Sequence, residues 1–279
     1  MSKKSLTILF ILALFVSLAA QQTDKGQKFQ PSVGQAGKDV IWVPTPDELV
    51  AAMLDMARVT AADFVIDLGS GDGRIAIAAA KRGARAMGIE YNPDMVALSR
   101  ENAEEAGVAD RATFRQADIF ESDFSKATVV TMYLLPDLNL RLRPKILELK
   151  PGTRVVSHAF TMDDWEADQT ADVEYRTAYL WIVPAKVAGT WTWSTPEGQA
   201  ELTLIQAFQK LEGIVFTAGK EQKLKDAKLE GDKIRFSLED DPNGVREYSG
   251  QVKGDVISGT VKGNSGPAAA WTAKRTKGR

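Results

Sequence analysis

A glycine-rich turn at residues 67–74, Asp-Leu-Gly-Ser-Gly-Asp-Gly-Arg, restricts the fold of this chain most strongly. Residues 63–68 before it form a short apolar segment typical of a buried strand, and the alanine-rich residues 75–81 after it predict a helix. A strand, a tight turn and a helix in this order begin a βαβ unit, whose strands are parallel. The chain is therefore expected to contain an α/β domain.

The same alternation continues along the chain. Four further strands are predicted at residues 84–90, 112–117, 128–135 and 153–160, and three further helices at residues 46–58, 93–107 and 137–149. Thr45 and Glu48 have the spacing of a capping box, with Pro46 at the first helical position. Residues 40–186 are thus expected to form one doubly wound, mostly parallel, Rossmann-like α/β sheet with helices on both faces.

The last part of the chain has a different pattern. From residue 187, short segments of alternating apolar and polar residues are separated by turns that contain glycine, and Gly231 and Gly254 are each followed by aspartate, as in hairpin turns. Residues 187–279 are predicted to form a small antiparallel β-barrel or sandwich, loosely similar to lipocalin-like β domains. The aromatic residues expected to fill its interior are Trp191, Trp193, Phe208, Phe216, Phe236 and Trp271.

The N-terminal segment has the layout of a targeting sequence. Lys3 and Lys4 precede an apolar run at residues 6–18 and a small-residue stretch that ends at Ala20. Residues 1–20 are therefore expected to be a signal peptide or an uncleaved membrane anchor, so that the protein is exported, either periplasmic or secreted, or tethered to the membrane. Residues 21–39 are polar and rich in glycine and glutamine, and predict a flexible tether.

Composition excludes several kinds of chemistry. The 279 residues include no cysteine and a single histidine, His158, so we expect no metal site, no disulfide and no thiol nucleophile. The formal net charge of -2 gives no electrostatic case for a nucleic-acid partner.

Acidic side chains lie at the ends of the first three predicted strands and suggest a nucleoside pocket. Asp67, Glu90 and Asp118 lie where the carboxyl ends of parallel strands meet, which is where such sheets bind ligands. A dinucleotide and S-adenosylmethionine both fit this arrangement. Arg74 occupies a position where a dinucleotide motif needs glycine or alanine, and the carboxylates of Asp67 and Asp72 would repel a pyrophosphate but attract ammonium and sulfonium groups. Charge therefore favours S-adenosylmethionine.

This order of motifs resembles class I S-adenosylmethionine-dependent methyltransferases. Residues 43–46, Val-Pro-Thr-Pro, ahead of residues 67–75, are more narrowly similar to the archaeal and mitochondrial protein-lysine methyltransferase group, and the resemblance covers about residues 40–186. It implies that Thr45 closes over the cofactor, that the turn faces its methionine part, and that the acids after the second and third strands bind ribose and adenine. The implied cofactor-binding residues are Thr45, Asp67, Gly69, Ser70, Gly71, Asp72, Gly73, Glu90, Asp118 and Ile119.

The implied reaction is methyl transfer to an acceptor nucleophile. Residues 133–136, Tyr-Leu-Leu-Pro, differ from the Asn-Pro-Pro-Tyr tetrad of enzymes that methylate amino groups of nucleic acids and glutamine, which disfavours those acceptors. A protein lysine is the acceptor that the resemblance implies, and a small molecule or lipid is the alternative. Tyr133, His158 and Asp163 are the catalytic candidates that would orient or deprotonate the acceptor.

Two other function classes stay open at this stage. A non-catalytic nucleoside-binding or envelope protein, with the β domain as its working part, would explain export, since S-adenosylmethionine is a cytoplasmic metabolite. A nicotinamide-dependent oxidoreductase would use the same glycine turn. No oligomeric state is predicted.

Overall fold

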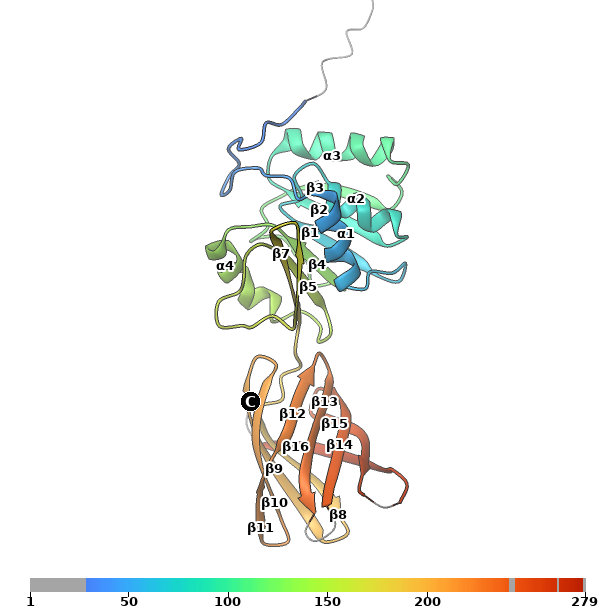
Figure 1. Ribbon diagram of the computed structural model, residues 1–279, viewed down its shortest axis with the longest axis vertical. Helices are drawn as coiled ribbons and strands as arrows, with labels where there is room; N and C mark the ends of the chain where they lie inside the picture. Colours follow the sequence, from blue (N-terminus) through green and yellow to red (C-terminus); the bar gives the residue numbers. More distant parts are fainter. Residues whose placement is uncertain (1–28, 241–243, 265, 278–279) are drawn as a thin grey trace, which may run out of the picture.

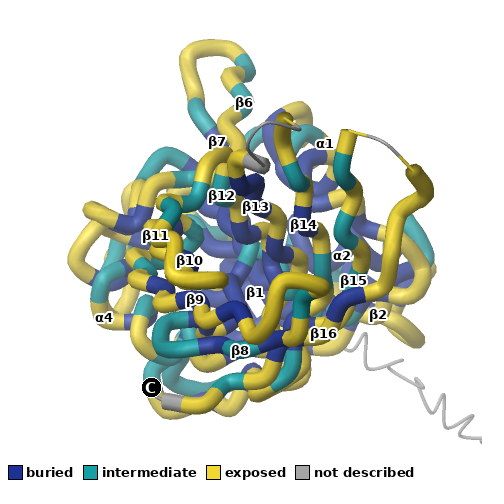
Figure 2. Tube along the Cα trace, turned by 90° about the horizontal axis from the view of Figure 1, so that it is seen from below, coloured by how far each residue is buried: buried dark blue, intermediate teal, exposed yellow. Residues whose placement is uncertain are grey.

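The protein is built around two β-sheets, one in the predicted α/β domain and one in the predicted β domain (Figure 1). The computed structural model describes residues 29–240, 244–264 and 266–277, so the predicted signal or anchor at residues 1–20 lies outside the described residues. Within those ranges, no helix is long and apolar enough to cross a membrane. Figure 2 shows buried chain at the centre of the molecule, exposed outer turns and a projecting β6–β7 hairpin.

The first sheet has seven strands in the order β3-β2-β1-β4-β5-β7-β6. The strands are β1 (Phe64–Leu68), β2 (Arg85–Glu90), β3 (Ala112–Gln116), β4 (Val129–Met132), β5 (Arg154–His158), β6 (Gln169–Val173) and β7 (Arg176–Ile182). The five strands predicted from the sequence pair in parallel, whereas β7 is antiparallel to both β5 and β6. The sheet is therefore mixed, and the antiparallel hairpin was not predicted.

Helices cover both faces of this sheet, as expected for a doubly wound fold. They are α1 (Asp47–Met56), α2 (Arg74–Lys81), α3 (Pro93–Glu105) and α4 (Pro136–Ile146). The buried apolar residues of α1 and α2 share one cluster with Val96 and Ala103 of α3. The buried apolar residues of α4 belong to another cluster on the opposite side of the sheet. The predicted capping box of α1 is wrong: Pro46 is the N-cap residue without a side-chain cap, because the Thr45 hydroxyl pairs with His158 instead.

The second sheet has nine antiparallel strands, in the order β11-β10-β9-β8-β16-β15-β14-β13-β12. It curls into a barrel-like shape that is nearly closed, since β10 and β12 lie side by side at its seam. The strands are β8 (Gly189–Thr195), β9 (Gly198–Ala207), β10 (Lys210–Thr217), β11 (Lys220–Lys223), β12 (Lys225–Glu230), β13 (Lys233–Asp240), β14 (Gly244–Lys253), β15 (Val256–Lys262) and β16 (Ala269–Lys277).

Aromatic side chains fill the interior of this β domain. Trp191, Trp193, Phe236 and Trp271 are buried there, as predicted, and the ring of Tyr248 stacks on that of Phe236 with 4.9 Å between centroids. Two predicted interior residues are elsewhere. Phe216 is 54% exposed on the outer face of β10, and Phe208 packs against the first domain. Strict alternation along β10 places residues 211 and 215 inside, so residue 216 must face outward.

The β domain contacts the amino-terminal edge of the parallel strands. The Ala185 amide donates to the Gly231 carbonyl oxygen at 2.8 Å, and Gly231 lies against Gly152, just before β5. Phe208 adds an aromatic contact, with its ring 5.7 Å from that of Trp165. The carboxyl ends of β1 to β5 therefore point away from the β domain (Figure 1).

We expect Phe208→Ala to weaken the contact between the domains without affecting the opposite edge of the sheet. Loss of the ring from Trp165 should cost about 2 kcal/mol in the free energy of unfolding, which is less than the roughly 3–5 kcal/mol for a fully buried phenylalanine because this ring is only partly buried. Thermal unfolding of the variant, compared with Phe216→Ala as an exposed control on the same sheet, measures this. An equal loss in both variants would contradict the assigned contact.

Candidate active site

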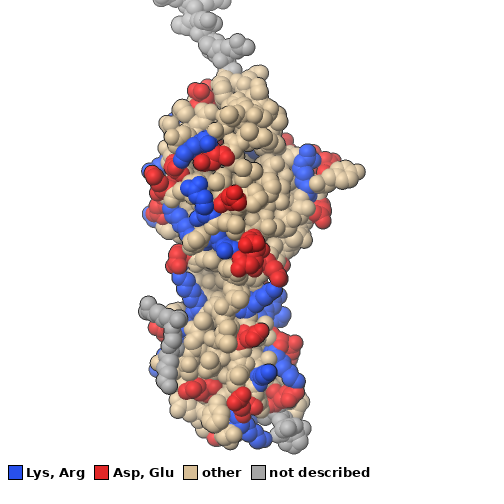
Figure 3. All heavy atoms as spheres, turned by 90° about the vertical axis from the view of Figure 1, so that its left-hand side faces the viewer, with Lys and Arg blue, Asp and Glu red and all other residues tan. Residues whose placement is uncertain are grey.

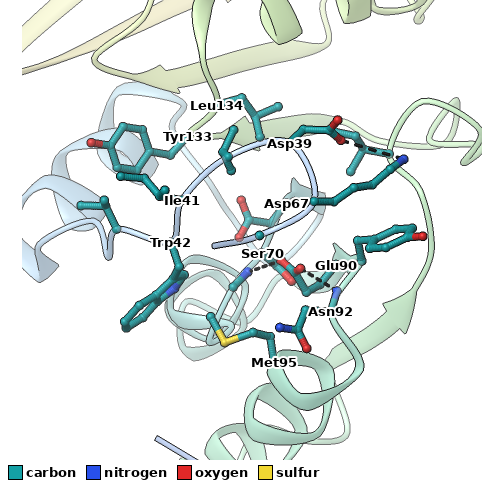
Figure 4. Close-up of a pocket in the computed structure, with 18 of the residues that line it drawn as sticks. Asp39, Ile41, Trp42, Asp67, Ser70, Glu90, Asn92, Met95, Tyr133 and Leu134 are labelled. Atoms are coloured by element: carbon teal, nitrogen blue, oxygen red, sulfur yellow. Dashed lines mark hydrogen bonds and ion pairs between the residues drawn. The ribbon is translucent and has the colours of Figure 1, made fainter. Parts of the chain in front are cut away.

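A cavity of about 650 Å³ opens at the carboxyl ends of β1 to β4, a size typical of small-molecule sites (Figure 4). It brings together all the predicted cofactor-binding residues except Gly73, together with the candidate Tyr133. The predicted residues that line it are Thr45, Asp67, Gly69, Ser70, Gly71, Asp72, Glu90, Asp118, Ile119 and Tyr133.

The glycines of the turn serve two purposes. Gly69 and Gly71 have φ values of +76° and +54° and line the cavity, and a Cβ on Gly71 would lie 2.7 Å from Nε1 of Trp42. Gly73 is the N-cap residue of α2, and a Cβ there would lie 2.7 Å from side-chain atoms of Phe114 and Ser99. Gly73 is therefore needed for helix packing and does not line the cavity, and its role toward the cofactor stays a prediction.

Glu90, the last residue of β2, is fixed by two backbone amides. Gly71 N–H donates to Oε2 and Asn92 N–H donates to Oε1, both at 2.9 Å. Each carboxylate oxygen accepts more than one hydrogen bond, so capacity remains for hydroxyl donors in the cavity. Glu90 is thus held in one orientation, suited to a ribose.

Asp67 is a buried carboxylate at the base of the cavity, with only 2% of its surface exposed. Burial raises its pKa to about 7; the Thr131 hydroxyl, which donates to Oδ1 at 2.7 Å, opposes this rise, and the charges of Asp72 and Glu90 add to it. A cation beside Asp67 would stabilise the ionised form. The site is therefore prepared for a positively charged group.

Arg74 changes the charge balance that the sequence suggests. Its guanidinium donates from Nη2 to Asp72 Oδ2 at 2.7 Å and from Nε to Oδ1 at 3.1 Å, while Nη1 donates to the Thr45 carbonyl oxygen. Asp72 is thereby neutralised within the protein. The attraction for a cation comes from Asp67 and Glu90, and Arg74 ties the glycine turn to the start of α1.

A hairpin at residues 34–42 forms the remaining wall of the cavity, and it was not predicted from the sequence. Residues 34–39 belong to this hairpin rather than to the predicted flexible tether. Lys38 at its tip pairs with Asp118, and Trp42 packs on Gly71. The apolar run at residues 40–43, Val-Ile-Trp-Val, is the signal that could have indicated an ordered segment here.

The three catalytic candidates are not brought together. Tyr133 lines the cavity, whereas His158 is buried and does not. The ring of His158 stacks on that of Tyr133, with 3.7 Å between the two centroids, and His158 Nδ1 lies 3.0 Å from Thr45 Oγ1. Burial lowers the His158 pKa to about 4, and the charge of Arg176 adds to this effect. Asp163 is exposed on the loop after β5 and does not line the cavity.

Comparison with known proteins agrees with this geometry. A family model of the ANTKMT methyltransferase domain matches residues 67–169. A protein-lysine N-methyltransferase of Saccharolobus islandicus (strain REY15A) is 45% identical over 151 residues, which cover 52% of this chain and 94% of the archaeal protein. This chain belongs to the S-adenosylmethionine-dependent methyltransferases.

Two other relatives match the same domain of this methyltransferase. The adenine nucleotide translocase lysine N-methyltransferase of Mus musculus is 38% identical over 104 residues, which cover 37% of this chain and 45% of the mouse protein. A solved structure of an RNA methyltransferase from Salinibacter ruber, in complex with S-adenosyl-L-homocysteine, is 54% identical with a TM-score of 0.51, covering 52% of this chain and 96% of that one.

The cavity of this methyltransferase fits its cofactor, S-adenosylmethionine. Asp67 offers a buried carboxylate for an ammonium group, and Gly69 and Gly71 leave room in which a Cβ would be crowded. Glu90 and Asp118 supply acceptors for hydroxyl and amino groups. Carboxylates in these positions disfavour the pyrophosphate of a nicotinamide dinucleotide. The cofactor assignment from the sequence is confirmed, and the nicotinamide alternative is not supported.

Proposed function

We propose that this methyltransferase methylates the ε-amino group of a lysine in a protein acceptor. The relative of Saccharolobus islandicus, matched over 94% of its own length and described as a protein-lysine N-methyltransferase, is the observation that carries the proposal. The mouth of the cavity, where Ile41, Val43, Tyr133 and Leu135 lie, supports the proposal, because these apolar and aromatic side chains suit a long side chain with an apolar stem.

RNA is the competing acceptor, because the Salinibacter ruber relative is described as an RNA methyltransferase. Two features argue against it here. The net charge is -2, and on the face in Figure 3 lysine and arginine are interspersed with aspartate and glutamate. RNA binding relies on a concentrated positive field along the phosphate backbone. A protein acceptor therefore fits the charge distribution better.

The reaction places few demands on catalytic side chains. S-adenosylmethionine supplies a methyl group on a positively charged sulfur, so the step needs alignment and an unprotonated amine. With the cofactor bound, the lone pair of the acceptor nitrogen would form the new bond to the methyl carbon as the carbon–sulfur bond breaks, which would give a methylammonium product and the thioether S-adenosylhomocysteine. Asp67, Glu90 and Asp118 would hold and orient the cofactor, while the stacked rings of Tyr133 and Phe160 would form a wall that excludes water.

The mouth itself favours loss of the lysine proton. Ile41, Val43 and Leu135 line the cavity and are also exposed, so an entering ammonium passes apolar side chains. Desolvation lowers the pKa of an ammonium group and so increases the neutral fraction. His158, whose own pKa is about 4, is too weak a base to take this proton and instead supports the ring of Tyr133.

Methyl transfer from labelled S-adenosylmethionine tests the proposal. The full chain is incubated with an envelope extract, chosen because residues 1–20 predict export, and the products are treated with protease or ribonuclease. We expect protease-sensitive label that appears as methylated lysine after hydrolysis. Label that ribonuclease removes would favour the RNA acceptor, and label in low-mass material would favour a small molecule or lipid.

Tyr133→Ala is expected to lower the rate of labelling roughly 100-fold, because the acceptor loses its aligned aromatic wall. Affinity for S-adenosylhomocysteine should change little, since the cofactor carboxylates remain. Tyr175→Ala is the matched control, because Tyr175 is fully exposed at the tip of the β6–β7 hairpin and does not line the cavity. Equal rates in the two variants would contradict the role given to Tyr133.

A further inference from the structure

The hairpin at residues 34–42 crosses the cavity as an ordered strap (Figure 4). The Gly34 amide donates to the Trp42 carbonyl oxygen at 2.9 Å, the Trp42 amide to the Gln35 carbonyl oxygen at 2.8 Å, and the Gly37 amide to the Val40 carbonyl oxygen at 2.9 Å. A Cβ on Gly37 would clash with the Val40 carbonyl oxygen, so the tight tip requires glycine. These bonds hold Lys38 at a fixed position over the cavity.

Lys38 contacts three residues that line the cavity, and one of them is the neighbouring Asp39, with 3.9 Å between Lys38 Nζ and Asp39 Oδ2. Its ammonium lies 2.5 Å from Asp118 Oδ2 and 4.7 Å from the centre of the Tyr91 ring. Both Asp118 and Tyr91 line the cavity. The hydrogen bond from Lys38 lowers the Asp118 pKa, and the same bond raises the Lys38 pKa. The pair is charged at neutral pH, and its side chains are only partly exposed, at 35% for Lys38 and 19% for Asp118.

The Asp118 carboxylate is already engaged by the protein. Oδ1 accepts the Phe120 amide at 2.8 Å, and Oδ2 accepts Lys38. A donor from the cavity that approaches Oδ2 must therefore share this oxygen with Lys38 or displace the lysine. The amino group of adenine is such a donor, and the face of Tyr91, where the ammonium now sits, is a surface on which a flat base stacks.

We propose that the strap is a latch, in which Lys38 competes with the adenine end of the cofactor for Asp118 and Tyr91 and leaves them when the cofactor binds. The proposal rests on the adenine role of Asp118 and is independent of the acceptor. The latch closes an empty site and lowers the net affinity for both cofactor and product. Release of S-adenosylhomocysteine is assisted, because Lys38 returns to Asp118 as the adenine leaves.

Calorimetric titration of the full chain with S-adenosylhomocysteine tests the latch. This ligand carries no sulfonium charge, so removal of a lysine charge does not by itself attract it. We expect Lys38→Met to bind it roughly two- to fivefold more tightly than the wild type, which is the range for a partly exposed ion pair. Lys225→Met, which breaks the pair with Glu239 inside the β domain, is the matched control and should leave the affinity unchanged.

The Asp118→Asn background separates competition from other effects of Lys38. This variant should itself bind the ligand more weakly, and Lys38→Met should add a smaller gain there, because the contested carboxylate is gone and only the face of Tyr91 is still contested. Amide exchange at Gly37 and Trp42 should be faster in Lys38→Met than in the wild type, which confirms that the strap opens while the rest of the domain stays folded.

Two results would overturn the latch. Unchanged or weaker binding by Lys38→Met would show that Lys38 is a spectator or a direct cofactor contact. An equal gain in the Asp118→Asn background would show that Lys38 acts through another group. Absence of binding by the wild-type chain would instead contradict the cofactor site itself, and label in RNA would contradict only the proposed acceptor.

Discussion

Gly71→Val is expected to weaken S-adenosylhomocysteine binding by at least about 100-fold, a loss of roughly 3 kcal/mol. Gly71 has a φ of +54°, which a β-branched residue adopts only with strain. A Cβ there would lie 2.7 Å from Trp42 Nε1 and 3.0 Å from its Cδ1. The turn must shift, and the Gly71 amide that holds Glu90 shifts with it. The variant therefore disturbs the strap, the turn and the ribose acceptor together.

Gly107→Val is the matched control for this prediction. Gly107 has a similar φ of +68° at the end of α3, but a Cβ there would meet nothing within 4 Å. Both variants should lose stability through backbone strain, and only Gly71→Val should lose affinity in calorimetric titration. Binding by Gly71→Val within threefold of the wild type would mean that the cofactor lies elsewhere.

Local sequence patterns were sufficient to predict most of the fold. The strands of the parallel sheet are recognisable because burial on both faces gives continuous apolar runs, as in β4, where every residue is buried. The antiparallel β6 escaped prediction because it is an edge strand of largely exposed residues, Gln-Thr-Ala-Asp-Val. Its place is set by pairing with β7, a tertiary effect that its own sequence does not show.

The cofactor site was predictable where its residues follow strands, and unpredictable where distant segments meet. Asp67 and Glu90 end adjacent strands, so topology alone places them together. Lys38 and Asp118 are 80 residues apart, and Thr45 and His158 are 113 apart, so neither contact has a local signal. The regular spacing of the three glycines also could not show that Gly69 and Gly71 line the cavity whereas Gly73 packs against Phe114 and Ser99.

Asp67→Asn should change binding and stability in opposite directions. Loss of the carboxylate removes the partner of the cofactor ammonium, and we expect S-adenosylhomocysteine affinity to fall by roughly 100-fold, as for a buried charged hydrogen bond. The cofactor-free variant should be more stable at pH 8, because asparagine removes a buried charge. At about 1.4 kcal/mol per pKa unit, the rise from 3.8 to about 7 corresponds to roughly 4 kcal/mol, an upper bound for this gain.

Asp63→Asn is the matched control, because Asp63 is buried at the start of the same strand but is paired. Burial opposes its ionisation, yet hydrogen bonds from Thr60, Thr128 and Arg154 outweigh burial and lower its pKa. Its replacement should therefore decrease stability at pH 8 and leave cofactor affinity unchanged. Denaturant unfolding measures the stability of both variants, and calorimetric titration measures their cofactor affinity. A fall in stability for both variants would contradict the assignment of Asp67 as an unpaired buried charge.

The pH dependence provides the last test of Asp67. Its folded-state pKa of about 7 exceeds the ordinary aspartate value of 3.8, so between these values the folded protein holds a proton that the unfolded chain has lost. Asp67 therefore contributes a fall in the free energy of unfolding of the cofactor-free protein as pH rises from about 4 to 7. Cofactor affinity should rise as pH approaches 8, because the ionised carboxylate pairs with the ammonium. Both slopes should flatten in Asp67→Asn, and a variant that keeps the wild-type slopes would assign the titration to another group.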